Sequence, residues 1–161
     1  MGPEYKEITK EELEKYRFLI LPMIYDELCE QEEINTEYIC IASVLNDEPA
    51  GVIITELEEN GNMNLLSIWT AQKYRRMGIA SALRDKMTEV AVNLYDWDES
   101  QYGDDIILKT MYSLSDNYRE IFEAWLEKND FTDFCILKDK EDDKPEIKSA
   151  TAEIHFMRFV G

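Results

Sequence analysis

Residues 65–80 read LLSIWTAQKYRRMGIA, and this stretch decides the fold. Its first part, through Thr70, is apolar and aromatic, which favours a strand. From residue 79 onward, apolar side chains recur at helical spacing as far as Leu94. The sequence therefore predicts a strand, a short loop and a helix, with the helix beginning near Gly78.

The loop between this strand and this helix has the features of an anion site. The first N–H groups of a helix have no acceptor within the helix, and the helix dipole favours a negative charge there. Gly78 lets the backbone approach a ligand closely, and Ala80 is small. Arg75 and Arg76 can add charge-assisted hydrogen bonds. Residues 73–86, KYRRMGIASALRDK, form a basic segment in an otherwise acidic chain, so the geometry suits a pyrophosphate.

The remaining patterns predict one domain over residues 1–161. We expect strands at residues 5–8, 38–45, 50–57, 63–70, 105–111, 131–137 and 152–160. A first helix follows Thr9 as its N-cap, Pro22 interrupts it, and a second helical piece runs through Leu28. Two more helices cover residues 79–94 and the amphipathic stretch around Trp125. The order β-αα-βββ-α-β-α-ββ predicts an α/β (α+β) fold with a mostly antiparallel sheet flanked by helices.

Composition narrows the class of protein further. The 161 residues are 45% hydrophobic and 11% aromatic, which is enough for one full core. The three cysteines lack the spacing of a metal site. Cys40 and Cys135 lie in apolar strands, so we expect reduced core cysteines. A catalytic cysteine or a zinc site would need a histidine partner, and His155 is the only histidine. We therefore predict no metal.

The formal net charge of −18 bears on partners and location. Such a chain repels nucleic acid and anionic membranes, and it attracts cations such as polyamines. The alternative is that the acidic residues only keep the protein soluble. The sequence begins without a signal peptide and has no run long enough to span a membrane. These features predict a cytoplasmic protein.

Residues 74–83, YRRMGIASAL, resemble the signature of the GNAT superfamily of acyl-CoA-dependent N-acetyltransferases. That signature is an Arg or Gln, two residues, Gly, one residue, and Gly or Ala, commonly read as Tyr-Arg-Gly-Lys-Gly-Ile-Gly or Ala. The order of elements is similar over nearly the whole chain. Downstream, Asn117 precedes a helix that ends in residues 125–131, WLEKNDF, similar to the family's Phe-Tyr-Glu-Lys-x-Gly-Phe.

The resemblance implies acetyl-CoA as cosubstrate and assigns roles to individual residues. Backbone amides of Arg76, Gly78 and Ala80, with those of their neighbours, would hold the pyrophosphate, and Arg75 begins the signature. Asn117 would bind the pantetheine arm, and the alternative is a helix N-cap shared with Ser115. The neighbours that complete the pyrophosphate loop are Met77, Ile79 and Ser81, and the strand residues that would pair with the pantetheine arm are Ile68, Trp69 and Thr70.

Two positions depart from the family pattern, and the general base is open. Leu126 stands where the tyrosine that protonates the departing thiolate is common, and Tyr118 and Tyr112 are substitutes or else packing residues. The base that takes the proton of the amine would be Glu56 or Glu58, unless these carboxylates lie on a solvated face. Asp130 replaces a glycine, which predicts a different cap at that helix end.

The sequence thus predicts an N-acetyltransferase that moves an acetyl group from acetyl-CoA to a cationic amine by direct attack. One alternative is a CoA-binding sensor or scaffold with little or no activity. Another is an acidic partner-binding protein without a CoA site. A homodimer could form through an exposed sheet edge, with the last strand as the candidate. Acceptor specificity is expected in residues 22–37, 95–104 and 138–150.

Overall fold

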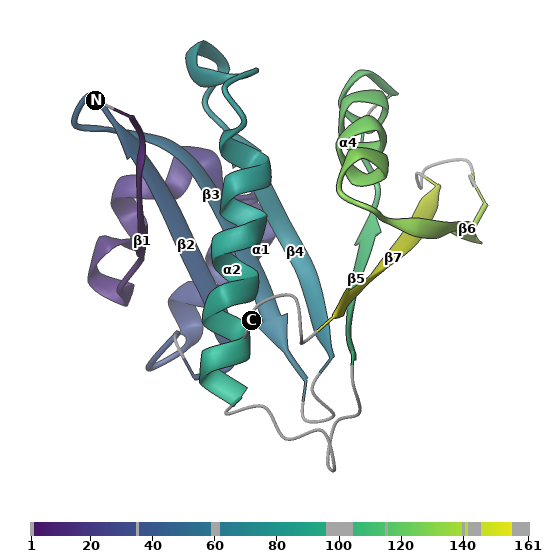
Figure 1. Ribbon diagram of the computed structural model, residues 1–161, viewed down its shortest axis with the longest axis horizontal. Helices are drawn as coiled ribbons and strands as arrows, with labels where there is room; N and C mark the ends of the chain where they lie inside the picture. The colour runs from purple at the N-terminus through teal and green to yellow at the C-terminus, as the bar shows by residue number, and fades with distance from the viewer. Residues whose placement is uncertain are drawn as a thin grey trace.

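The computed structural model describes residues 2–34, 36–58, 62–95, 105–114, 116–139, 141 and 146–155. Within these residues, seven strands form one sheet in the order β1-β2-β3-β4-β5-β7-β6 (Figure 1). All neighbouring pairs are antiparallel except β4 and β5. The strands are β1 Glu4–Glu7, β2 Tyr38–Leu45, β3 Glu48–Leu57, β4 Met63–Thr70, β5 Asp105–Tyr112, β6 Thr132–Lys138 and β7 Ile147–His155.

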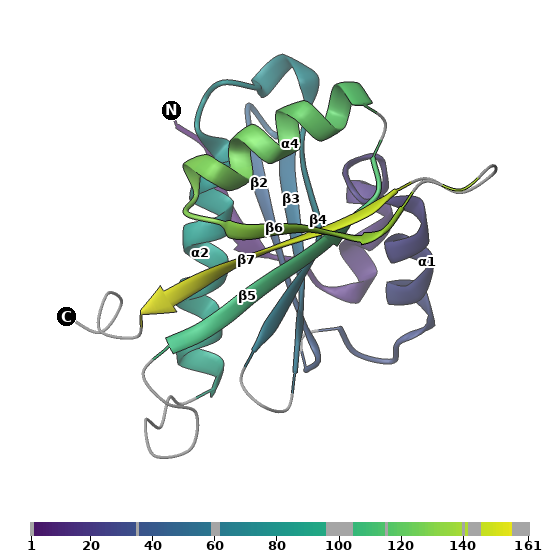
Figure 2. The same cartoon turned by 90° about the vertical axis from the view of Figure 1, so that its right-hand side faces the viewer.

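Helices cover both faces of the sheet. One apolar cluster packs α2 (Ile79–Tyr95) and the end of α4 (Asp116–Lys128) on one face, through residues such as Leu83 and Leu126. The other cluster packs the 3-10 helix η1 (Lys10–Leu19) and α1 (Pro22–Glu30) on the opposite face, through Leu13 and Leu28. A single turn, η2 (Gln72–Tyr74), lies between β4 and α2. Figure 2 shows α2 and α1 on opposite sides of the strands.

β4 and β5 pair only at one end, and this opens the sheet. Their register covers Met63 to Leu65 against Leu108 to Thr110. The pairing of β4 with β3 slips at Leu66, which is the extra residue of a β-bulge. Beyond the bulge β4 and β5 diverge, as Figure 1 shows. We call residues 66–70 the free half of β4, because only its β3 side is paired.

The predicted fold class and element order are confirmed, with corrections to particular elements. Pro22 is the first residue of α1, where proline is well tolerated, and the preceding helix η1 has already ended at Leu19. The last strand starts at Ile147 and not at residue 152. Lys148, Ser149 and Thr151 each pair with both β5 and β6. The charged residues just before this segment made it look like a loop in the sequence. Residues 156–160 of the predicted strand lie outside the described residues, as do residues 96–104 of a segment expected to carry acceptor specificity.

Two further expectations about side chains and edges were wrong. Cys40 is buried, which raises the pKa of its thiol to about 12, but Cys135 is exposed on β6. The last strand, β7, lies between β5 and β6 and is not an edge. β6 is the edge instead, and its Ile136 and Leu137 are about half exposed. In the described part of the chain, no helix is both long and apolar enough to cross a membrane.

Candidate functional site

The turn after β4 has an irregular backbone that leads into the first turn of α2. Arg76 and Gly78 have positive φ angles of 68° and 76°. The first backbone hydrogen bond of the helix runs from Ala82 N to Gly78 O, at 3.0 Å. The amides of residues 79–81 therefore belong to the turn that an α-helix leaves without internal acceptors. A Cβ at Gly78 would meet no atom within 4 Å, so this turn faces open space.

Gly51 on β3 sets how closely α2 approaches the sheet. A Cβ at this position would lie 3.0 Å from Ile79 Cγ2, 3.1 Å from Leu83 Cδ1 and 3.2 Å from Trp69 O. Real Cβ atoms rarely come so close to other atoms, so only glycine fits without a shift of the helix. We did not single out Gly51 from the sequence, because its role depends on a helix more than 25 residues away. The neighbouring hydrogen bond from Ala71 N to Ala50 O, at 2.8 Å, fixes the start of the turn.

The basic segment of the sequence separates into different surroundings. Lys73 pairs with Glu48 on β3, with a hydrogen bond of 2.8 Å. Lys86 approaches Glu89 at 3.8 Å on the surface of α2. Arg84 is only 3% exposed and so cannot reach a ligand at the turn. The segment is therefore not one basic patch.

Arg75 and Arg76 remain exposed on the turn itself. Neither forms an ion pair with a carboxylate in the described residues. Two unpaired guanidinium groups beside a helix N-terminus make this turn attractive to an anion in a chain of net charge −18. Met77, which lies between Arg76 and Gly78, is 55% exposed.

A stack of three side chains joins the turn, the free half of β4 and α4. The guanidinium carbon of Arg75 lies 5.5 Å from the ring centroid of Trp69 on β4. Arg75 Nε also donates a hydrogen bond to Thr70 O at 3.3 Å. Tyr118, from the first turn of α4, packs on Trp69 with ring centroids 5.1 Å apart. The stack brings three of the residues expected in the site together.

The two candidate tyrosines have different surroundings. Tyr112 is 7% exposed, and its hydroxyl donates to Glu123 Oε2 at 2.8 Å. Burial raises the pKa of Tyr112, and its hydrogen bond to Glu123 and that carboxylate's charge raise it further. Tyr112 is therefore a weak acid with its proton already shared. Tyr118 is 45% exposed and lies against the free half of β4.

The proposed bases lie elsewhere. Asn64 Nδ2 donates hydrogen bonds to Glu56 at 3.3 Å and Glu58 at 2.6 Å. Asn64 pairs with Lys109 at the closed end of the β4–β5 junction. The structure therefore does not bring Glu56 or Glu58 to Trp69 and the free half of β4.

A comparison with known families decides the identity of this fold. Residues 5–105, from β1 to the start of β5, match the model of the acetyltransferase (GNAT) family. The chain belongs to this family. It is therefore an acyltransferase enzyme with acetyl-CoA as its cosubstrate. The predicted superfamily is confirmed.

Solved structures show the same fold at low sequence identity. Ard1 from Thermoplasma volcanium is 18% identical with a TM-score of 0.64, covering 96% of this chain and 99% of that one. The ribosomal-protein-S18-alanine N-acetyltransferase from Escherichia coli is 14% identical with a TM-score of 0.65, covering 96% and 95%. An acetyltransferase from Bacillus anthracis in complex with acetyl coenzyme A is 15% identical with a TM-score of 0.64, covering 96% and 99%. No curated protein matches the sequence.

The structure places two further positions of the family pattern. Leu126, in place of the tyrosine common in GNAT proteins, is fully buried in the core shared with α2. Asn117 is exposed in the first turn of α4, which begins at Asp116, so Asn117 is not the N-cap. Ser115, the other cap candidate, lies outside the described residues.

The end of α4 keeps the cap typical of a glycine although Asp130 is present. Asp130 has a φ of 68°, Phe131 N donates to Leu126 O at 2.9 Å, and Asp130 N donates to Glu127 O at 3.2 Å. These bonds form a Schellman motif, so the expectation of a different cap was wrong. Beside it, Asn129 Nδ2 donates to Ser81 Oγ at 3.2 Å. That bond ties the end of α4 to the first turn of α2.

Proposed function

We propose that this GNAT enzyme transfers the acetyl group of acetyl-CoA to a cationic amine by direct attack, without an acyl-enzyme. The observation that carries the proposal is the continuity between the free half of β4 and the first turn of α2. The free half of β4 offers an unpaired strand edge, and the first turn of α2 offers backbone amides with Arg75 and Arg76 beside them. An extended molecule with an anionic end matches both.

The donor would bind along this path. Amides of residues 76–81 would hold the pyrophosphate, with charge from Arg75 and Arg76. The backbone of Ile68, Trp69 and Thr70 would hydrogen-bond the pantetheine arm as a strand does. Asn117, exposed in the first turn of α4, would bind the same arm from the other side.

The reaction requires one bond to form and one to break. The neutral amine attacks the thioester carbonyl carbon, the carbon–sulfur bond breaks, and the CoA thiolate takes a proton as the amide nitrogen loses one. We assign Tyr118 as the proton donor, because it is exposed and lies against the free half of β4. Tyr112 is the poorer donor, because its hydroxyl already binds Glu123. Proximity supplies much of the rate, since a thioester is an activated donor.

The acceptor is assigned from charge alone. A chain of net charge −18 attracts ammonium groups and repels polyanions. A cytoplasmic location and a homodimer stay predictions, and among the described strands the two edges of the sheet open to a second copy are β1 and β6.

The test is thiol release from acetyl-CoA with a panel of amines, using the wild type and two tyrosine variants. We expect Tyr118→Phe to lower kcat by about 100-fold, the size of effect of losing a general acid. Acetyl-CoA affinity, measured by calorimetry, should stay within about 3-fold, because the aromatic ring remains. Tyr112→Phe, the matched control, should keep kcat within a few-fold. Equal losses in both variants would remove the assignment of Tyr118.

The second candidate function is a CoA-binding sensor, which the buried Leu126 favours. It predicts that acetyl-CoA binds but no amine in the panel releases thiol. Release with any amine above the rate of hydrolysis would exclude it.

A further inference from the structure

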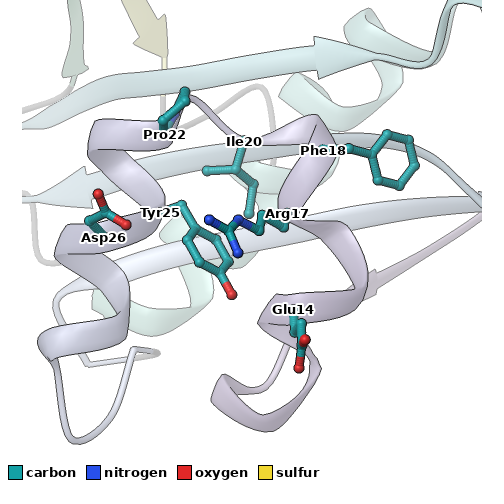
Figure 3. Close-up of a pocket in the computed structure, with 7 residues that line it drawn as sticks. All are labelled: Glu14, Arg17, Phe18, Ile20, Pro22, Tyr25 and Asp26. Atoms are coloured by element: carbon teal, nitrogen blue, oxygen red, sulfur yellow. The ribbon is translucent and has the colours of Figure 1, made fainter.

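A pocket of about 510 Å³ lies between η1 and α1. Figure 3 shows its lining residues on the two helices, with strands behind them. Its lining residues are Glu14, Arg17, Phe18, Ile20, Pro22, Tyr25 and Asp26. The proposed function uses none of these side chains.

The chain between two residues that line this pocket is hydrogen-bonded to the free half of β4. Ile20 and Pro22 flank Leu21, whose amide donates a hydrogen bond to Ser67 Oγ at 3.3 Å. Ser67 directly follows the bulge at Leu66. Trp69 packs against the same apolar cluster as Ile20. The segment that includes Leu21 therefore links the pocket to β4, the strand proposed to hold the thioester arm.

Arg17 is the cation of the pocket. Its guanidinium carbon lies 5.1 Å from the ring centroid of Tyr25, and Figure 3 shows the group between the two helices, directed at that ring. Glu14 and Asp26 line the same pocket, yet Arg17 forms no ion pair with a carboxylate in the part of the chain that the structure describes. A guanidinium that stacks on an aromatic face keeps its edge N–H groups for a planar, bidentate partner.

We propose that the acceptor is an amine that also bears one carboxylate, and that Arg17 binds this carboxylate. The inference rests on the proposed transferase activity and narrows its acceptor. Phe18, Ile20 and Tyr25 offer apolar surface to the body of the molecule, and Phe18 is 64% exposed. Glu14 and Asp26 disfavour a second negative charge, so the class is an amino monocarboxylate and not a phosphate or a dicarboxylate.

An amino monocarboxylate carries one positive and one negative charge and so has no net charge, and the net charge of −18 neither favours nor opposes this class. The choice of this class rests on the pocket around Arg17. The carboxylate takes no part in the covalent step: the amine nitrogen gains the acetyl group and loses a proton, and the thiolate leaves and is protonated. Arg17 is thus a specificity residue, and we expect it to act mainly on KM.

The experiment compares matched acceptors that differ only in the carboxylate. Phenylalanine is paired with phenylalaninamide and leucine with leucinamide, and thiol release from acetyl-CoA is followed with the full chain. We expect wild-type kcat/KM to favour the acid over the amide, and Arg17→Gln to reduce that ratio at least 10-fold through KM. An amide also lowers the pKa of the neighbouring ammonium, but this difference cancels when the ratio is compared between wild type and variant.

Lys15→Gln is the control variant, because Lys15 is an exposed cation on the same helix that does not line the pocket. It should leave the ratio unchanged, and circular dichroism would confirm that both variants are folded. Release with an unchanged ratio in Arg17→Gln, or release only with an amine lacking a carboxylate, such as spermidine, overturns the inference and leaves the transferase activity intact. Acetyl-CoA binding with no release from any amine means instead that the proposed function has failed.

Discussion

Arg76 and Asp130 have the same backbone conformation at two helix ends that a hydrogen bond joins. Both have a φ of 68°, and both stand where the GNAT pattern commonly has glycine. Arg76 precedes α2 and Asp130 follows α4, and Asn129 and Ser81 connect the two ends. Their surroundings differ in whether the nearby backbone groups of the helix end are hydrogen-bonded within the chain.

At the end of α4, the chain closes its own hydrogen bonds around Asp130. Phe131 and Asp130 donate to the last carbonyl groups of the helix, which explains the left-handed residue without any ligand. At the start of α2, the amides of the first turn lie beyond the internal hydrogen bonds. A strained residue such as Arg76 at an open site indicates function, whereas Asp130 serves the fold. Substitutions at the first end should change acetyl-CoA affinity, and those at the second should change stability.

The largest effect is expected at Gly78. Gly78→Asp and Gly78→Asn place side chains of the same shape in open space, and the backbone strain of a side chain at a φ of 76° is similar in both variants. Only Asp adds a negative charge near the pyrophosphate. Calorimetry should show acetyl-CoA binding about 100-fold weaker for Asp and only a few-fold weaker for Asn, in line with a lost anion site. Equal affinities for the two variants would mean that this turn does not bind the anion.

Arg76→Gly should have a smaller effect than Gly78→Asp: it should weaken acetyl-CoA binding and raise the stability of the fold. Losing the guanidinium should weaken acetyl-CoA binding about 10-fold at low salt, and less at high salt, because salt screens exposed charges. Relief of the left-handed conformation should raise the free energy of unfolding by about 0.5 kcal/mol. Urea titrations would measure that gain. An unchanged affinity at low salt would leave Arg76 without a role in binding.

Asp130→Gly should give the smallest effect, and on stability alone. Glycine adopts a φ of 68° without strain, so we expect about 0.5 to 1 kcal/mol of added stability. Acetyl-CoA affinity should stay unchanged. A change in affinity would show that the bond between Asn129 and Ser81 transmits the shape of one helix end to the other, and the two ends would then not be independent.

The sequence predicted the parts of the site that depend on local order. A strand, a glycine and a helix at fixed spacing define the turn around Gly78, and the structure has these elements in place. Contacts between distant residues were not predictable in this way. Lys73 pairs with Glu48, 25 residues away, and the basic segment is divided as a result. Gly51 shows no local signal, since its value lies in the distance to Ile79.

The catalytic side was also harder to predict because it depends on which side chains face the free half of β4. Tyr112 and Tyr118 are six residues apart, and nothing in their spacing indicates that one hydroxyl binds Glu123 while the other ring lies on Trp69. The pocket beside η1 and α1 needed the folded chain for the same reason.

The stack of Arg75 on Trp69 gives the protein an optical reporter of its own. An indole with a guanidinium 5.5 Å from its centroid and a tyrosine ring at 5.1 Å is sensitive to the departure of either neighbour. If Arg75 turns toward a bound pyrophosphate, the emission of Trp69 should change as the donor binds. Occupancy of the donor path could then be followed by stopped-flow fluorescence in the native chain, without a label.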